Sequence, residues 1–525
     1  MRTAFRTICC LAFTGGASAQ LDFLPSPPPG SIEVRLTTLT DQLTAFIDGR
    51  QQFTPVDMSP FPDGSERLAV LTLGGFVHII DDDGTQLPEP YLDVVTPATD
   101  LTAPGSYGII SIAFHPDFAD DTAPGHRKFY IIETEFVTAG VPDFDDSLLP
   151  IGIGGQHHDV IYEYTVDDTA ANVFTGTKRE VLRIEQPGAD HNTFDLAFGV
   201  TPADEGLLYI PIGDGAVAGQ AFSTMRENAR TPNNVFGTII RIDPLGTNGI
   251  NGINGQYGVP ASNPFVGTPG ARPEVYSIGH RSPYRLTADR LTGELWLGEV
   301  GQDQIEEVNR IIPGANYGWP DKEGSFLFDQ TDHSANAIDA DLDGNGTGDF
   351  ADANGYTDPV FEVDHQTAQS ITGGFVYRGS AIPELQGRYT FGNASPGFPT
   401  GIGLYHGDPA NGPVSGDTGG VEEFVISPDG DALPSRIISI GEDLNGELYI
   451  LGLRNGFQGV LLRADPVPGD GCLADTNGDG VVNPADFSAW VIAFNTQCPA
   501  CDQNGDGLCN PADFNAWAAN FNAGC

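Results

Sequence analysis

Several polar segments of the sequence hold side chains of the types that move a proton and stabilise negative charge in reactions on small molecules, His280 and Glu299 among them. His191 lies in the segment GADHNTFDLAFG, Asp214 in IPIGDG and Arg281 in IGHRSPYR. A histidine whose tautomer is fixed by a carboxylate can act as a general base near neutral pH, and an arginine can stabilise an oxyanion. Each segment is polar where a predicted strand meets a loop. We therefore expect the three side chains to converge at one end of the fold if they act together.

A second set of residues, near the C-terminus, has the spacing of EF-hand calcium loops. One loop runs from Asp475 to Asp486 and the other from Asp502 to Asp513, each with glycine at the sixth position for the sharp turn. Each loop leads into a predicted short amphipathic helix, DFSAWVIAF or DFNAWAANF. The predicted calcium ligands are Asp475, Asn477, Asp479, Val481, Asn483 and Asp486 in the first loop, and Asp502, Asn504, Asp506, Leu508, Asn510 and Asp513 in the second.

The elements that must position the first set are predicted strands. Segments 68–75, 128–135, 207–214, 294–301, 387–394 and 447–453 are apolar, rich in aromatic and β-branched residues, and flanked by turns and further apolar strands. One such antiparallel meander cannot bury both faces, whereas six arranged radially pack face to face. The pattern predicts an all-β, six-bladed β-propeller, with a pair of β-sandwiches as the competing fold. Long insertions at 137–159 and 326–358 are loops on which a site could be built.

Charge and the N-terminus restrict the partners and the location. The chain has 71 acidic and 24 basic residues and a formal net charge of -47, which repels phosphate backbones and anionic lipid. Nucleic acid is therefore not an expected partner. Residues 1–19 have the form of a secretory signal, with basic Arg2 and Arg6, an apolar stretch, and small residues ending at Ala19. No later stretch is long and apolar enough to span a bilayer. We expect a secreted protein, whether extracellular, attached to the cell surface or periplasmic.

The cysteines separate a C-terminal module from the rest of the chain. Cys9 and Cys10 leave with the predicted signal, and the other five are Cys472, Cys498, Cys501, Cys509 and Cys525. In an exported chain this clustering predicts a small domain with disulfides and one remaining thiol, with a zinc cluster as the rival. The predicted organisation is a propeller over 20–465, a Pro-Gly linker over 466–471 and the module over 472–525.

On the two calcium loops, residues 472–525 resemble a type I dockerin, the duplicated module that attaches secreted enzymes to cohesin receptors. The resemblance implies that the two helices fold on binding calcium and dock to a cohesin-like protein. The chain departs from that family at Pro484-Ala485 and Pro511-Ala512, where hydroxyl residues are often used for recognition, and in its cysteines. A stabilising or surface-retention role is the alternative.

The larger part of the chain, over most of residues 55–465, resembles the glucose/sorbosone dehydrogenase family, whose soluble members are six-bladed propellers that use pyrroloquinoline quinone (PQQ) and calcium. The motifs that carry the resemblance are GSYGIISIAFHPDF, HNTFDLAFG, LLYIPIGDG, NNVFGTIIRIDP, IGHRSPYR, GELWLGEVGQDQIEEVNRI, GANYGWP, ITGGFVYRGSAIPELQGRY and GEDLNGELYIL.

The resemblance implies a role for each member of the first set. His191 would take the proton from the anomeric hydroxyl of a sugar while hydride passes to the quinone, Asp214 would orient His191, and Arg281 would stabilise the reduced quinone. Asn192 and Ser282 would contact the cofactor together with Arg281. The implied calcium site, which would polarise the cofactor, comprises Gly301, Gln302, Glu306, Glu307 and Tyr317.

The leading functional hypothesis is a PQQ- and calcium-dependent dehydrogenase that oxidises an aldose or related sugar and passes electrons to an unidentified acceptor. A non-catalytic propeller that binds carbohydrate or protein is the alternative. It is favoured by Thr193 and Phe194, which stand where the family has two glycines, and by Ser282 in place of an asparagine. A polysaccharide-degrading hydrolase or lyase is the third hypothesis, although no pair of carboxylates at an interpretable spacing is visible for it.

Overall fold

The computed structural model describes residues 24–43, 46–47, 50–51, 54–81, 83–94, 108–137, 139–145, 157–188, 190–216, 224–246, 249–302, 304–328, 355–395, 401–412, 416–456, 458–467, 474–477, 482–496, 501, 503 and 508–523. The predicted signal at 1–19 and most of the predicted linker at 466–471 lie outside these residues.

The chain is mostly β, as the sequence predicts, and four of its sheets are four-stranded antiparallel meanders. They comprise β4 (Pro55–Pro60), β5 (Leu68–Thr72), β6 (Phe76–Ile80) and β7 (Leu92–Asp93); β8 (Ile109–Phe114), β9 (Lys128–Phe136), β10 (His157–Val166) and β11 (Gly176–Gln186); β12 (Ala197–Phe198), β13 (Leu208–Ile212), β14 (Thr238–Ile242) and β17 (Val275–Ile278); and β18 (Pro283–Ala288), β19 (Leu295–Glu299), β20 (Ile305–Ile311) and β23 (Phe361–Asp364).

A larger sheet of eight strands joins two further meanders through β1 (Pro29–Thr40). β1 pairs antiparallel with β30 and parallel with β27, so a strand from the start of the chain covers an edge formed near its end. The other strands are β24 (Gln369–Val376), β25 (Tyr389–Ser395), β26 (Leu404–Gly407), β27 (Glu422–Ile426), β28 (Arg436–Glu442), β29 (Leu448–Arg454) and β30 (Gln458–Pro466).

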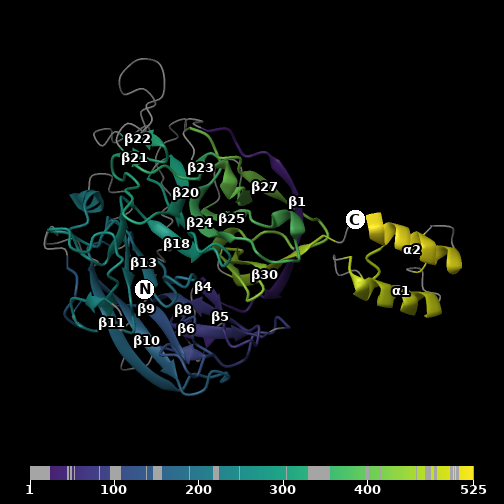
Figure 1. Ribbon diagram of the computed structural model, residues 1–525, viewed down its shortest axis with the longest axis horizontal. Coiled ribbons are helices and arrows are strands. Elements are labelled where there is room, and N and C mark those ends of the chain that lie inside the picture. The colour runs from purple at the N-terminus through teal and green to yellow at the C-terminus, as the bar shows by residue number, and fades with distance from the viewer. Residues whose placement is uncertain are drawn as a thin grey trace, which may run out of the picture.

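The sheets surround a common centre in a propeller-like arrangement (Figure 1). Buried hydrophobic clusters fill the boundaries between neighbouring sheets. Ile132 of β9 and Ile210 of β13 share one cluster, and Trp296 of β19 packs on Tyr389 of β25 with ring centres 5.4 Å apart. Because each sheet has apolar side chains on both faces, it is buried only when a sheet lies on either side of it. Packing between sheets, rather than within one, therefore holds the fold together.

Short elements complete the described chain. The two-stranded pairs are β2 (Phe46–Ile47) with β3 (Arg50–Gln51), β15 (Ile250–Asn251) with β16 (Gly258–Val259), and β21 (Lys322–Glu323) with β22 (Phe326–Leu327). The 3-10 helices are η1 (Thr224–Arg230), η3 (Pro383–Leu385) and η4 (Pro409–Asn411). No helix among the described residues has the length and apolar character needed to cross a membrane.

At the C-terminus lie two α-helices, α1 (Pro484–Thr496) and α2 (Pro511–Ala523), side by side in Figure 1. Both begin with proline at the first position after an asparagine cap, and the Asn483 and Asn510 side chains accept hydrogen bonds from Ala485 N and Ala512 N. The tryptophan of each helix forms a hydrogen bond with the other repeat: Trp490 Nε1 donates to the carbonyl of Cys501, and Trp517 Nε1 donates to the carbonyl of Ala474.

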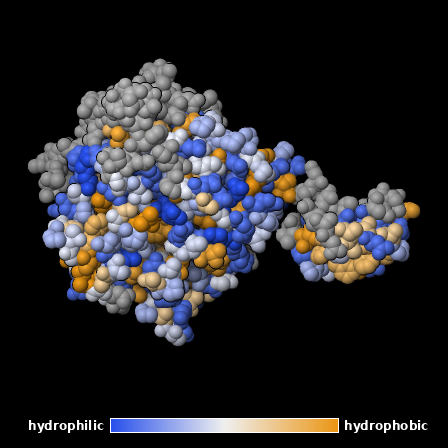
Figure 2. All heavy atoms as spheres, turned by 45° about the horizontal axis from the view of Figure 1, so that its top comes forward, coloured by the Kyte–Doolittle hydropathy of each residue, from blue (hydrophilic) through white to orange (hydrophobic). Residues whose placement is uncertain are grey.

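Over the visible face of the sheets, hydrophobic and hydrophilic residues are interspersed (Figure 2). Hydrophobic residues gather more closely on the C-terminal helices, where Phe487, Ile492 and Phe514 are exposed. One disulfide joins Cys501 to Cys509. Cys472, Cys498 and Cys525 lie outside the described residues.

Candidate functional site

The three residues predicted to act together lie side by side, in loops at the ends of inner strands. His191 precedes β12, Asp214 follows β13, and Arg281 lies between β17 and β18. Two main-chain hydrogen bonds join these loops directly: Asp214 N donates to the carbonyl of Arg281 at 2.9 Å, and Gly215 N to that of His191 at 3.1 Å. The relative positions of the side chains are therefore fixed by backbone contacts.

The imidazole of His191 is held by the carboxylate of Asp214. Nδ1 of His191 lies 2.7 Å from Oδ1 of Asp214, and the two side chains are 4% and 0% exposed. Asp214 also accepts hydrogen bonds from Ala216 N at 2.9 Å and from Trp319 Nε1 at 2.8 Å. Because this carboxylate only accepts, it places the proton of His191 on Nδ1 and leaves Nε2 as the basic atom.

Burial and charge set the protonation of this pair. Burial lowers the pKa of His191, and the positive charge of Arg281 lowers it further, while Asp214 acts in the opposite direction. Burial by itself raises the pKa of Asp214, but the attraction of His191 and Arg281 and the hydrogen bonds outweigh it, so that this pKa is lowered. The arrangement therefore favours a neutral imidazole beside an ionised carboxylate, which is the state a general base requires.

The guanidinium of Arg281 lies over the ring of Trp319. Its Nε donates to Oε1 of Gln302 at 3.0 Å and its Nη1 to the carbonyl of Val300 at 2.9 Å, and its guanidinium carbon is 5.7 Å from the centre of the Trp319 ring. The guanidinium carbon of Arg226, in η1, lies 5.1 Å from the same ring. Two permanent cations thus stand beside the indole of Trp319, a combination that suits a flat anionic molecule.

The other two predicted cofactor contacts lie in the same loops. Asn192 and Ser282 are both buried, and each follows a member of the site directly in the chain. The carbonyl of Asn192 accepts a hydrogen bond from Gly213 N, and that of Ser282 accepts one from Val300 N. The main chain at both positions holds the site together, and cofactor contact by their side chains stays a prediction.

Three of the five residues predicted for the propeller calcium site line one small cavity. They are Gly301, Glu307 and Tyr317, and the charged residues Glu299, Glu323, Arg281 and Lys322 line it with them. Its volume of about 10 Å³ is that of a single water-sized particle. Burial raises the pKa of Glu307 to about 8, and the nearby charge of Glu299 contributes to the rise. The three carboxylates offer the oxygens that calcium prefers, and they share the cavity with the positive charges of Arg281 and Lys322.

Of the other two predicted members, Glu306 binds other groups, while the predicted ligand of Gln302 is its main-chain carbonyl, which stays a prediction. Glu306 accepts hydrogen bonds from Ser370 N and Ile371 N and lies 2.8 Å from Nε2 of His365. Gln302 accepts from Arg281 through its side chain. Within the part of the chain that the structure describes, no group of three or more His, Cys, Asp or Glu side chains is arranged to hold a metal ion.

In the C-terminal module, the last predicted ligand of each loop is buried. Asp486 accepts hydrogen bonds from Asn477 N at 3.2 Å and Asn483 N at 2.8 Å, and Asp513 accepts from Gln503 N at 3.0 Å and Asn510 N at 2.8 Å. Asp475 and Leu508 are also described. The predicted ligands Asp479, Val481, Asp502, Asn504 and Asp506 lie outside the described residues. Calcium binding by these loops stays a prediction.

Sequence reasoning gave no role to Trp319 or Arg226, although Trp319 contacts Asp214 and Arg281 and Arg226 lies beside the Trp319 ring. Trp319 belongs to the segment GANYGWP, and its contact with Asp214 bridges 105 positions of the chain. A tryptophan between a glycine and a proline in a loop was the available signal. Arg226 lies in a 3-10 helix outside the quoted motifs, and nothing in its local sequence distinguished it from a surface arginine.

Comparison with known proteins gives the family and the fold of the chain. The profile of the family described as Glucose / Sorbosone dehydrogenase matches residues 53–395. Among solved structures, a crystal structure of glucose dehydrogenase covers 82% of this chain and 98% of its own, at 21% identity and a TM-score of 0.54. The apo-form of the soluble aldose sugar dehydrogenase from Escherichia coli covers 83% of this chain and 100% of its own, at 20% identity and a TM-score of 0.54. At these identities the structures show a shared fold.

Curated relatives are of two kinds. HIPL1 protein of Arabidopsis thaliana is 26% identical over 490 residues, which are 85% of this chain and 67% of the relative, and HIPL2 protein is 28% identical over 64% of this chain and 50% of the relative. Quinoprotein glucose dehydrogenase B of Acinetobacter calcoaceticus is 26% identical over 54% of this chain and 55% of the relative. The chain thus spans between half and two thirds of the length of these relatives.

Proposed function

The chain belongs to the glucose/sorbosone dehydrogenase family, and from this premise we propose that it is a secreted, PQQ-dependent dehydrogenase that oxidises the anomeric hydroxyl of an aldose or related sugar. The observation that carries the proposal is the buried group formed by His191, Asp214, Trp319 and Arg281. This group combines a base, the carboxylate that orients it, a permanent cation and the aromatic ring of Trp319. A PQQ-bound aldose sugar dehydrogenase of Streptomyces coelicolor shares the fold at a TM-score of 0.50, which supports the choice of cofactor.

The fold on which this site is placed is, we infer, a six-bladed propeller. The eight-stranded sheet consists of two antiparallel meanders that β1 joins by its parallel pairing with β27. Counted as two blades, they make six with the four separate sheets. β1 would then complete the last blade, so that the ends of the chain close the ring.

The residues fit the cofactor in chemical type. PQQ is a flat polyanionic quinone, and Arg281 and Arg226 supply cations while Trp319 supplies a face for stacking. When bound, PQQ supplies the two-electron acceptor for hydride from the anomeric carbon. Asn192 and Ser282 would contribute further contacts from the same loops.

The residues of the chain would perform the proton chemistry. Nε2 of His191 takes the proton of the anomeric hydroxyl as hydride leaves its carbon, so that the sugar becomes a lactone. Asp214 stabilises the imidazolium that forms and keeps the ring in place. Arg281 stabilises negative charge at the site, and burial keeps bulk water from competing for the proton.

Calcium completes the proposal at two places. In the propeller, Glu307, Gly301 and the main chain near Tyr317 would hold an ion in the small cavity beside Arg281, where it would act as a Lewis acid. At the C-terminus, the two loops would bind calcium as an EF-hand does, and the module would tether the enzyme to a cohesin-like partner. The exposed Phe487, Ile492 and Phe514 give the helices an apolar surface for such a contact.

The pH profile of aldose oxidation by the PQQ-loaded enzyme tests the base. His191 acts in its neutral form, and burial and Arg281 lower its pKa, so the neutral form persists as the pH falls below the ordinary value of 6.5. We expect kcat/KM to fall on the acid side with a midpoint below pH 6.5. A midpoint at or above that value, measured with a panel of aldoses and an artificial dye as acceptor, would contradict this assignment.

Calcium removal tests the C-terminal loops. Without the ion, the carboxylates of Asp486 and the other ligands repel one another, and α1 and α2 are too short to persist alone. We therefore expect a chelator to reduce helical circular dichroism in the full chain and added calcium to restore it, with the sheet signal unchanged. Replacing Asp486 and Asp513 with alanine together should remove the response, and a response of wild-type size in that variant would exclude these loops.

A non-catalytic propeller that binds a protein is the second candidate. The relatives that cover most of this chain include HIPL1 protein and human hedgehog-interacting protein, the latter 25% identical over 77% of this chain and 49% of its own length. Phe194 stands at a position where glycine is expected and packs on Tyr284 with ring centres 5.5 Å apart. An aromatic contact in this loop thus replaces a position where no side chain is expected. A folded protein that binds no PQQ would favour this candidate.

A further inference from the structure

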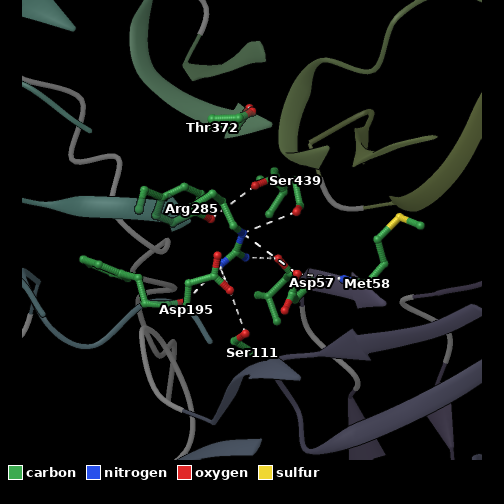
Figure 3. Close-up of polar contacts among 12 residues, drawn as sticks. Asp57, Met58, Ser111, Asp195, Arg285, Thr372 and Ser439 are labelled. Carbon is green, nitrogen blue, oxygen red and sulfur yellow. Dashed lines mark hydrogen bonds and ion pairs between the residues drawn. The ribbon is translucent and has the colours of Figure 1, made fainter. Parts of the chain in front are cut away.

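Arg285, for which neither the site nor the proposed mechanism provides a role, lies at the centre of the propeller-like body. It belongs to β18, four residues after Arg281, and is 3% exposed. Figure 3 shows its guanidinium among Asp57, Asp195 and Ser439, with Ser111 and Thr372 nearby, on side chains that come from different sheets. A charged group buried so deeply is costly unless every one of its partners is in place.

The guanidinium binds three other parts of the fold at once. Nη1 donates to the carbonyl of Phe194 at 2.8 Å, Nη2 donates to the carbonyl of Val56, and Nε donates to Oγ of Ser439 at 3.3 Å. The carboxylates of Asp57 and Asp195 lie 4.0 and 3.9 Å away. Arginine has donors on three separate nitrogens at fixed spacing, so it reaches all three acceptors at once, whereas the donors of lysine all lie on one nitrogen.

The carboxylate of Asp195 also binds strand β18, and it binds Ser111 as well. Its Oδ2 accepts from Leu286 N at 2.8 Å, and its Oδ1 accepts from Ser111 Oγ at 2.8 Å. Asp195 and Phe194 are therefore both bound to β18, the first through Leu286 and the second through Arg285.

These contacts act on the loop that carries the base. His191 is anchored at one end of the segment 191–195 by Asp214 and Gly215, while Phe194 and Asp195 form the other end. Arg281, the other member of the site, lies just before β18. Strand β18 thus supports Arg281 and the Phe194 end of this segment, while Asp159 and Gly213 hold its middle by accepting from Thr193 N and donating to the carbonyl of Asn192.

We propose that Arg285 is a positioning residue, which sets the place of His191 relative to Asp214 and Arg281 by holding the carbonyl of Phe194 against β18. The inference deepens the proposed function and rests on it for its effect on turnover. Its effect on the geometry of His191 is independent of whether any cofactor binds. A lateral shift of about 1 Å in a catalytic group can reduce turnover by about a hundredfold.

The test compares Arg285→Lys with Arg290→Lys in the full chain. Arg290 is a matched control, since it too donates to main-chain carbonyls, of Asp443 and Leu444, and pairs with a carboxylate, Glu442, but makes these contacts away from the His191 loop. The first readout is the downfield proton resonance of His191 Nδ1–H, assigned by its loss in His191→Gln. The second is the division of the effect between kcat and KM, together with the Kd for PQQ.

We expect Arg285→Lys to move or broaden the His191 resonance and to lower kcat by about ten- to a hundredfold, with KM and the Kd for PQQ within about threefold of wild type. The resonance of His280, which pairs with Glu299 at 2.9 Å, serves as an internal reference. Arg290→Lys should leave the His191 resonance and kcat as in wild type. A folded Arg285→Lys protein with an unchanged His191 resonance overturns the inference whatever its activity.

Asp195→Asn covers the case in which Arg285→Lys does not fold. Asparagine keeps an oxygen for Leu286 N, removes the charge that faces Arg285, and places an amide nitrogen where Oδ1 accepts from Ser111 Oγ and Leu196 N. We expect the same displacement of the His191 resonance and a smaller fall in kcat, and an unchanged resonance overturns the inference here as well. If wild type oxidises no aldose, the proposed function fails, while the resonance still decides whether Arg285 positions His191.

Discussion

Replacing His191 with alanine is expected to lower kcat for aldose oxidation by about a thousandfold and to leave the Kd for PQQ within about threefold. The imidazole is the one group of the site that is both held in a single tautomer and kept neutral by its surroundings. Its removal takes away the proton acceptor, whereas the guanidinium groups and the indole of Trp319, which would bind the cofactor, are untouched.

The measurement is steady-state oxidation with an artificial dye, alongside calorimetric titration of PQQ into both proteins. His78→Ala is the control, because His78 is a buried histidine in β6, a strand that contributes no residue to the site. It should retain the kcat of wild type. A His191→Ala protein that binds PQQ and turns over at a rate near wild type would show that another group accepts the proton.

Replacing Asp214 with asparagine is expected to lower kcat by about a thousandfold to ten-thousandfold. The change preserves shape but presents an amide where the carboxylate accepts from three donors, His191 Nδ1, Ala216 N and Trp319 Nε1. The amide oxygen can satisfy some of these donors, and the amide nitrogen must then face another. The imidazole is driven to the wrong tautomer or turned away, and the stabilised imidazolium is lost.

Asp289→Asn is the matched control for loss of a buried carboxylate. Asp289 is 3% exposed and pairs with Arg378 through both oxygens, outside the site. We expect it to lose stability, as Asp214→Asn does, but to keep kcat. Measurement of thermal unfolding beside kcat separates the two effects. Equal kcat values for the two variants would mean that Asp214 is a structural carboxylate.

Much of the site could be predicted from the sequence, because its members lie where strands meet loops within recognisable motifs. His191, Asp214 and Arg281 were expected to converge, and the structure places them together through main-chain bonds. The mostly β fold also followed from the repeated apolar strands. In both cases the local pattern carries the information, since the alternation of apolar residues and turns defines each strand and its ends.

What the sequence could not give depends on contacts between distant segments. Trp319 meets Asp214 across 105 positions, and β1 pairs with β27 and β30 near the other end of the chain. By contrast, the sequence could have shown that the side chains of Glu306 and Glu307 point in different directions. Neighbouring residues of one strand point to opposite faces, so two adjacent glutamates of β20 do not readily share one ion.

If this propeller holds PQQ beside His191, calorimetric titration of PQQ into the purified, calcium-loaded protein should show saturable binding at one site per chain. The loaded protein should then reduce dye in the presence of an aldose. A folded protein that releases no heat with PQQ and reduces no dye would contradict this proposal, and would leave recognition of a carbohydrate or protein as the function of this propeller.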